Sequence, residues 1–131
     1  MKPLFIFAIN LLISYSITAQ ISFEEQQRIA FPLKGLACLY GNDLDGDGNN
    51  DIIASAYSCG RLSWFKNLGN MVFAYEYCIS SNYMYLSAIS FDVDNDGDND
   101  IIAGSSQRIE LFRNLGNGKF SNGMLFYFVR Y

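Results

Sequence analysis

The chain of 131 residues contains no histidine and only two prolines, and charged residues make up just 17% of it. The absence of histidine removes the commonest general base, the Ser-His and Cys-His nucleophile pairs, and most catalytic zinc sites. The nine lysine and arginine residues form no run, so neither nucleic acid nor an anionic membrane is an expected partner. We therefore expect a protein that is not an enzyme.

What is abundant favours β structure. Hydrophobic residues make up 50% of the chain and aromatic residues 16%, and there are eleven glycines. Aromatic residues are enriched in strands, and glycine is enriched in the tight turns between them. The length allows one ordinary domain, and the composition is too apolar for a disordered chain.

The first nineteen residues have the composition of a secretory signal peptide. Lys2 precedes an apolar stretch over residues 3–13, and a more polar segment ends at Ala19, a suitable residue before a cleavage site. The alternative is an uncleaved anchor, but the apolar stretch is shorter than the roughly 20 residues of a spanning helix. We expect a secreted protein, extracellular or at the cell surface, with no stable membrane insertion after cleavage. Export permits disulfides, but three cysteines leave at least one thiol unpaired within the chain.

The rest of the chain contains an internal repeat. Residues 43–54 align with residues 92–103, which lie 49 positions further on (Asp43 to Asp92). Residues 61–70 align with residues 108–117, which lie 47 positions further on (Arg61 to Arg108). The second copy is therefore two residues shorter, and the difference falls near Ser58–Gly60. Such internal repetition indicates an architecture built from similar units.

Each copy is predicted to form four short strands. In the first copy they are expected at residues 35–41, 51–56, 61–66 and 72–79, joined by turns rich in glycine and asparagine. The predicted fold is all-β, with two four-stranded antiparallel blades of the β-propeller type plus a leading strand, in an incomplete, open propeller. The expected divisions are a signal peptide at 1–19, a leading strand and linker of a partial repeat at 20–34, and repeats at 35–80 and 84–128.

All nine aspartates lie in two short segments of the repeat, residues 43–51 and 92–100. In both segments, carboxylates stand at positions 1, 3, 5 and 9 and a glycine at position 6. This set of hard oxygen ligands without His or Cys suits Ca²⁺ better than zinc or copper. An EF-hand is excluded because Ala54 and Ala103 stand where a bidentate Glu is required, and because the flanking segments are predicted to be strands. The alternative is a solvated acidic turn without metal.

The motif Asp-x-Asp-x-Asp-Gly-x-x-Asp, followed by Ile-Ile-Ala and later by Trp64-Phe65-Lys66-Asn67-Leu68-Gly69-Asn70, resembles the FG-GAP/VCBS repeat of integrin α-subunit propellers and many secreted bacterial proteins. The resemblance covers roughly residues 23–126. It implies two structural Ca²⁺ sites, in which side chains from most positions and one main-chain carbonyl, that of Asn49 or Asp98, bind the ion. The implied ligands are Asp43, Asp45, Asp47, Asn49 and Asp51 for one ion, and Asp92, Asp94, Asp96, Asp98 and Asp100 for the other.

The expected function is that of a non-catalytic binding or adhesion scaffold whose partner is a protein or a carbohydrate. Exposed tyrosines could stack on sugars. Two alternatives remain: a propeller segment of a larger secreted enzyme, either a metal-dependent hydrolase or a carbohydrate-active one, and a truncated fragment without independent function. Because two blades do not close a ring, apolar faces are expected to be exposed at both ends. Self-association through these blade edges is a further expectation. The residues expected to be exposed there include Ile89, Phe91, Ile109 and Leu111.

Overall fold

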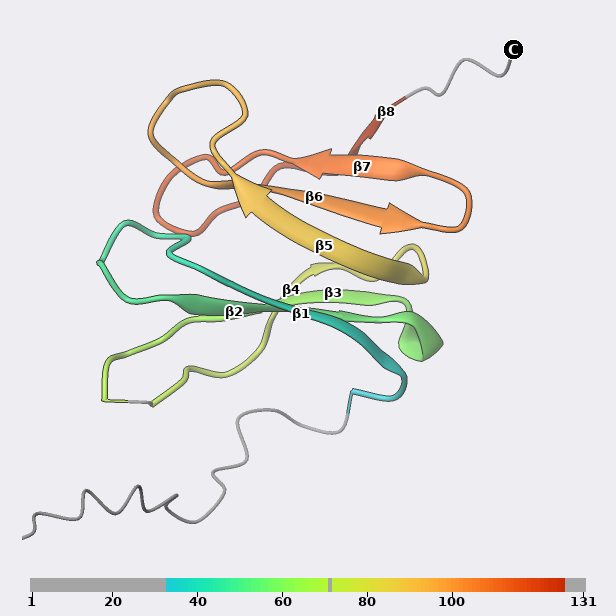
Figure 1. The fold of residues 1–131 in the computed structure, drawn as a ribbon, viewed down its shortest axis with the longest axis horizontal. Coiled ribbons are helices and arrows are strands. Elements are labelled where there is room, and N and C mark those ends of the chain that lie inside the picture. Colours follow the sequence, from blue (N-terminus) through green and yellow to red (C-terminus); the bar gives the residue numbers. More distant parts are fainter. Residues whose placement is uncertain (1–32, 71, 127–131) are drawn as a thin grey trace, which may run out of the picture.

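The computed structural model describes residues 33–70 and 72–126, which form eight strands and one short 3-10 turn (Figure 1). The strands of the first sheet are β1 (Leu36–Asn42), β2 (Asp51–Ala56), β3 (Arg61–Phe65) and β4 (Tyr77–Ser80). Those of the second sheet are β5 (Tyr85–Phe91), β6 (Asp100–Ser105), β7 (Ile109–Phe112) and β8 (Met124–Phe126). The 3-10 turn η1 (Tyr57–Cys59) joins β2 to β3.

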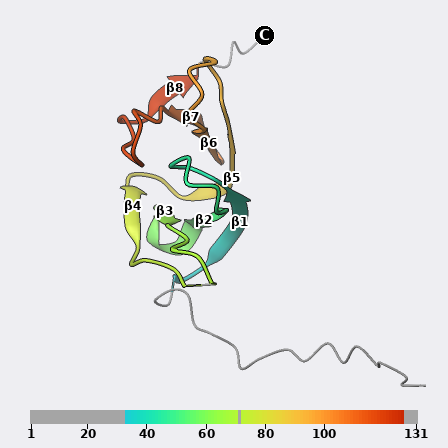
Figure 2. The same cartoon turned by 90° about the vertical axis from the view of Figure 1, so that its left-hand side faces the viewer.

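The two sheets have the same topology. Their strand orders are β1-β2-β3-β4 and β5-β6-β7-β8, and every neighbouring pair is antiparallel. The sheets lie one above the other, with β1 next to β5 (Figures 1 and 2). The prediction of an all-β fold with two four-stranded antiparallel units in an open propeller is confirmed.

One core lies between the two sheets. The second strand of each sheet is an inner strand, and Ile53 and Ile101 on these strands are both 0% exposed. Each therefore buries its whole side chain, which contributes about 1.5–3 kcal/mol relative to an exposed one. The core cluster combines residues of both sheets, namely Leu44, Ile53, Leu62, Trp64, Tyr85, Ala88, Ile101, Ala103 and Phe112. The two copies are thus packed into one unit.

The two-residue length difference between the copies falls in the turn after the second strand. In the first sheet this connection contains η1 and ends on Gly60, whose φ of 65° is the left-handed conformation that glycine adopts without strain. In the second sheet the N–H of Ser105 donates to the carbonyl of Arg108, at 2.9 Å, and closes a tighter turn. The deletion therefore shortens a connection and leaves the paired strands intact.

Some expected boundaries were wrong. The fourth strand, expected at residues 72–79, begins only at Tyr77, although Phe73 forms an isolated bridge with Asn67. Between that bridge and the Trp64–Tyr77 pair, one side of the hairpin has an extra residue, which interrupts the ladder. The first strand covers residues 36–42 instead of 35–41, and the third ends at Phe65 rather than at residue 66.

The expectations for the chain ends have different outcomes. The signal peptide at 1–19 lies outside the described residues, and so does the leading segment at 20–34 except for residues 33 and 34, which are not in a strand. Ile89 and Phe91 are each 45% exposed, as expected for an end face. Leu111 is only 5% exposed, so its expected exposure was wrong, and Ile109 is half-buried instead of exposed. Cys38, Cys59 and Cys78 are free thiols.

Candidate metal-binding sites

The two aspartate loops lie at the same end of the two sheets, where β1 leads into β2 and β5 into β6 (Figure 1). The first loop bends through Gly46 and Gly48, with φ values of 75° and 85°. The second bends through Asn95 and Gly97, with φ values of 61° and 95°. Asparagine is the residue other than glycine that most readily adopts this conformation. The loops therefore share one backbone shape despite the Gly-to-Asn difference.

The last aspartate of each loop is a buried anchor. Asp51 is 0% exposed, and its two carboxylate oxygens accept hydrogen bonds from the main-chain N–H of Asn67 at 2.7 Å and of Leu44 at 3.1 Å. Asp100 is 1% exposed and accepts equivalent bonds from Asn114 at 2.8 Å and Val93 at 3.2 Å. Each carboxylate thus ties its own loop to the turn that follows the third strand.

The first aspartate of each loop closes the turn. Asp43 accepts from the main-chain N–H groups of Gly46 and Gly48, both at 2.8 Å. Asp92 accepts from Asp96 at 3.2 Å and from Gly97 at 3.0 Å. These bonds aim both carboxylates toward the inside of their loops.

Three carboxylates converge in each loop. One group consists of Asp43, Asp45 and Asp51, and the ligand atoms they offer lie within 4.8 Å of one another. The equivalent group in the second loop consists of Asp92, Asp94 and Asp100. Three oxygen-bearing anions this close repel one another unless a cation lies between them, and hard oxygen ligands are those that Ca²⁺ binds.

The third position of each loop has an unsatisfied oxygen. Oδ1 of Asp45 and Oδ1 of Asp94 are buried and have no hydrogen-bond partner among the described residues. A buried carboxylate oxygen without a partner costs about 1–3 kcal/mol or more. A cation within the carboxylate group would supply the missing partner in both loops, so these residues fit a bound metal ion.

The same aspartates have a basic neighbour. Lys66 forms an ion pair with Asp45 and a second with Asp47, whose Oδ2 lies 2.9 Å from Nζ. Arg113 pairs with Asp94 in the second loop. These ion pairs were missed in the sequence analysis, which assigned neither residue a role in the loops. The signal that could have found them is the recurrence of a basic residue just before Asn-Leu-Gly-Asn in both copies.

In the first loop, the pKa of an exposed aspartate and that of the buried one shift in opposite directions. A hydrogen bond with Lys66, helped by the main-chain N–H of Asn49, lowers the pKa of Asp47. Burial raises the pKa of Asp51, against the lowering effect of its two main-chain hydrogen bonds. Hydrogen bonds with Asp45 and then Asp47 raise the pKa of Lys66. One lysine thus pairs with two of the four aspartates of the loop.

The remaining expected ligands lie at the rim of the loops. Oδ1 of Asp47 accepts from the N–H of Asn49 at 2.9 Å, and Oδ1 of Asp96 accepts from the N–H of Asp98 at 2.9 Å. Neither Asp47 nor Asp96 belongs to the three-carboxylate groups. Their role as ligands, and that of the carbonyls of Asn49 and Asp98, remains a prediction.

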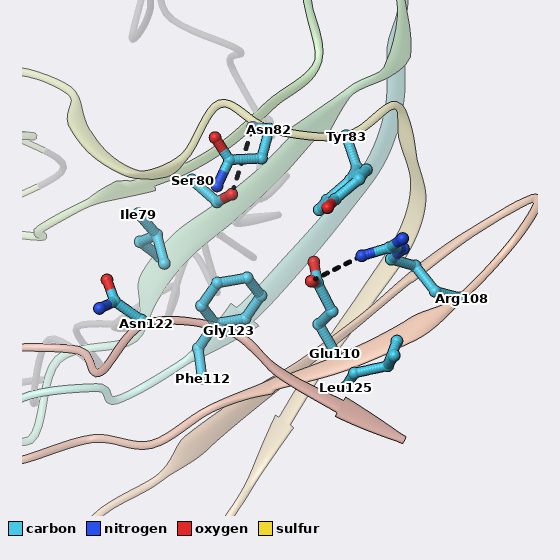
Figure 3. Close-up of a pocket in the computed structure, with 10 residues that line it drawn as sticks. All are labelled: Ile79, Ser80, Asn82, Tyr83, Arg108, Glu110, Phe112, Asn122, Gly123 and Leu125. Carbon is cyan, nitrogen blue, oxygen red and sulfur yellow. Dashed lines mark hydrogen bonds and ion pairs between the residues drawn. The ribbon is translucent and has the colours of Figure 1, made fainter. Parts of the chain in front are cut away.

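A separate pocket of about 320 Å³ opens between the sheets, at β4, β7 and the segment before β8 (Figure 3). Glu110 lines it and is only 6% exposed. Its Oε2 accepts a 2.7 Å hydrogen bond from the hydroxyl of Tyr85, and Arg108 lies 3.7 Å from its Oε1 and stacks over the ring of Tyr83 at 3.9 Å. The pocket therefore holds one carboxylate that protein groups already engage.

Together these features define a class of protein: an all-β repeat protein of the open propeller type with an acidic loop in each unit. The family model described as FG-GAP-like repeat matches residues 43–103 and 92–128. The chain therefore belongs to the FG-GAP-like repeat family, as its motifs predicted. No curated protein and no solved structure gives a significant match.

The family indicates the general function of such repeats. Repeats of this family are typically non-catalytic, β-propeller-like binding scaffolds, and they occur in extracellular proteins. Within residues 33–70 and 72–126, the structure contains no helix of the length and apolarity that crossing a bilayer requires.

Proposed function

We propose that this chain is a secreted, calcium-stabilised propeller segment that acts as a non-catalytic binding or adhesion scaffold. The observation that carries the proposal is the convergence of three carboxylates within 4.8 Å in both loops, each with a buried oxygen that lacks a hydrogen-bond partner. Because both copies have it, the arrangement is a property of the repeat and not of one turn.

In the proposed sites the ion is structural. Asp43, Asp45 and Asp51 hold one ion, with Asp47 and the carbonyl of Asn49 completing its shell. The equivalent ligands of the second ion are Asp92, Asp94, Asp96, the carbonyl of Asp98, and Asp100. The ion cross-links a loop to the buried anchor below it and neutralises like charges. Main-chain N–H groups already hold the anchor carboxylates, which favours a fixed cage over an open catalytic site.

Calorimetric titration with Ca²⁺ tests the proposal. We expect two sites per chain at the weak, extracellular end of the affinity range, with dissociation constants on the order of 10⁻⁴–10⁻³ M. Asp45→Asn should remove one site and Asp94→Asn the other, each leaving its counterpart unchanged. Asn49→Ala is the matched control, since only its main-chain carbonyl is a proposed ligand. Absence of binding to the unmodified chain at millimolar Ca²⁺ would refute the metal sites.

The partner of the scaffold is proposed to be a protein or a carbohydrate. Tyr75 and Tyr77 support a stacking surface because they are 85% and 53% exposed. Tyr85, which is 0% exposed, cannot serve in this way. The ring of Trp64, the only tryptophan, lies 5.1 Å from that of Tyr77, so a bound sugar should change its fluorescence. The test is a titration with a panel of soluble polysaccharides, supported by binding to immobilised glycans. If no polysaccharide changes the fluorescence and no glycan binds the chain, the proposed partner is a protein.

A further inference from the structure

Two side-chain amides connect the second sheet to the first aspartate loop. Nδ2 of Asn99 donates to the main-chain carbonyl of Asp43 at 2.8 Å, and Nδ2 of Asn114 donates to that of Leu44 at 2.7 Å. We call these two bonds the amide latches. Asn114 is 2% exposed and Leu44 is 1% exposed, so the second latch lies deep in the contact between the sheets.

The repeat places the same groups at the two outer faces of the pair of sheets, where no second sheet of the described residues meets them. Asn50 and Asn67 of the first copy align with the latch donors, and Asp92 and Val93 of the second copy align with the latch acceptors. Among the described residues, the amide of Asn50 donates no hydrogen bond, and that of Asn67 reaches only the carbonyl of Asn50 in its own sheet. No hydrogen bond to the carbonyls of Asp92 and Val93 is found there either.

Both outer faces expose apolar residues on their first strand. Ile89 and Phe91 on β5 are each 45% exposed on the face of the second sheet that points away from the first. On the opposite outer face, β1 presents Leu39, which is 59% exposed, and Gly41, which lacks a side chain. A side chain built on Gly41 would approach only the carbonyl of Asp51, at 3.7 Å, so the space above it is open. The outer face of the second sheet thus carries two large side chains, and that of the first sheet has open space at Gly41.

We propose that copies of this chain associate head to tail, with the second sheet of one copy packed on the first sheet of the next. The contact repeats the one between the two sheets within the chain. Asn50 and Asn67 of one copy donate to the carbonyls of Asp92 and Val93 of its neighbour, and Ile89 and Phe91 pack beside Leu39 and Gly41. Such a contact is heterologous, so it closes a ring when the rotation permits and otherwise continues as a filament. Propellers of roughly 4–8 blades correspond to rings of two to four copies.

The structure offers one variant for each outer face. Leu39→Lys combined with Asn50→Ala impairs the outer face of the first sheet, and Ile89→Lys combined with Phe91→Lys impairs that of the second. All four positions are exposed, so each variant is expected to keep its fold and its calcium sites. In saturating Ca²⁺, sedimentation velocity of the purified chain at about 100 µM should give a mass of two to four copies if the ring closes, and larger species of several sizes if the contact continues as a filament. Each variant alone should sediment as a single chain, with a dissociation constant raised at least about 100-fold.

Mixing the two variants tests the direction of the contact. Each retains one intact outer face, so an equimolar mixture should form a complex of one copy of each and nothing larger. The inference is overturned if the unmodified chain remains a single copy, if the variants assemble like the unmodified chain, or if the mixture forms no complex. Calcium titration of the same samples separates this inference from the proposed function: a single-copy species that binds two ions contradicts only the association.

Discussion

The hydroxyl of Tyr85 donates a 2.7 Å hydrogen bond to Oε2 of Glu110, and both side chains are more than nine-tenths buried between the sheets. The first sheet has no acid at the position of Glu110, because Ser63 stands there. Its carboxylate comes instead from Glu76, which accepts from Ser63 and pairs with Arg61 at 3.1 Å. Each sheet therefore carries an Arg-Glu pair, but the acid comes from the segment before β4 in the first sheet and from β7 in the second.

Replacing Tyr85 by Phe should change the pH dependence of stability. Burial raises the pKa of Tyr85 above its ordinary 10.0, and the Glu110 carboxylate adds to the shift. The folded chain then holds the phenolic proton where the unfolded chain releases it. The contribution of Tyr85 to the free energy of unfolding is therefore fully present below pH 10. Above pH 10 it falls by about 1.4 kcal/mol per pH unit. The unfolding free energy of Tyr85→Phe, followed by denaturant titration at pH 9–11, should fall less steeply than that of the unmodified chain.

The comparison has an internal control. Lys66, whose pKa is also raised, adds a slope of the same sign to both proteins and cancels in the difference. At neutral pH, Tyr85→Phe should cost about 1–3 kcal/mol, because Glu110 loses its donor. Tyr75→Phe, at a position 85% exposed, should behave like the unmodified chain. Parallel slopes for all three proteins would contradict the role of Tyr85.

Replacing Lys66 by Gln should affect the metal-free and the calcium-bound chain in opposite directions. The lysine neutralises part of the loop charge without metal, so its loss should lower the stability measured in a chelator. Since the same lysine competes with a cation for Asp45, the calcium affinity of the first site should rise several-fold. Arg113→Gln should do the same at the second site only. Calorimetry in the background of Asp94→Asn measures the first site alone, and in the background of Asp45→Asn the second. A decrease in affinity in either variant would show that the base assists binding.

Replacing Gly118 by Ala should be markedly destabilising. The glycine has a φ of 66°, and a Cβ there would lie 2.1 Å from the ring of Trp64. The ring is part of the core cluster and packs against the rings of Tyr77 and Phe120, so displacing it would disturb that packing. Gly69→Ala is the matched control, because its φ of 85° imposes similar backbone strain while no atom lies within 4 Å of the new Cβ. Urea unfolding should show that Gly118→Ala costs at least about 1–3 kcal/mol more than Gly69→Ala, and equal costs would contradict the packing argument.

The internal repeat made most of the fold predictable. Because residues 43–54 and 92–103 align, strands β2 and β6 and both aspartate loops could be placed from the amino-acid sequence alone. The three carboxylates that converge in each loop all belong to the ligands that the motif implied, whereas Asp47 and Asp96 at position 5 lie outside these groups. The interrupted β4 could not be foreseen, since nothing in residues 72–76 marks the extra residue that breaks the ladder.

The differences between the two copies could not be predicted from the internal repeat. Glu76 aligns with Gly123, and Glu110 with Ser63, so the shift of the acid from one side of the hairpin to the other looks like two unrelated mismatches. In the structure a side chain on Gly123 would lie 3.2 Å from the carboxyl carbon of Glu110, so the glycine makes room for the acid. The pairing depends on contacts across the hairpin, which alignment along the chain does not show.

Removal of calcium should lower the stability of the whole unit. A ligand that binds only the folded state stabilises it by RT ln(1 + [L]/Kd), which is about 1.4–2.7 kcal/mol per site at about 10 mM Ca²⁺ for dissociation constants of 10⁻³–10⁻⁴ M. Two sites thus add about 3–5 kcal/mol, and 1 kcal/mol moves the melting temperature of a domain this size by about 4–8 °C.

Because Asp51 and Asp100 anchor each loop to a buried turn, the sheets should melt with the loops in one transition. Scanning calorimetry with Ca²⁺ or a chelator should therefore show a single peak that shifts. Asp45→Asn should retain about half of the shift, and a midpoint independent of Ca²⁺ would show that the loops are stable without the ion.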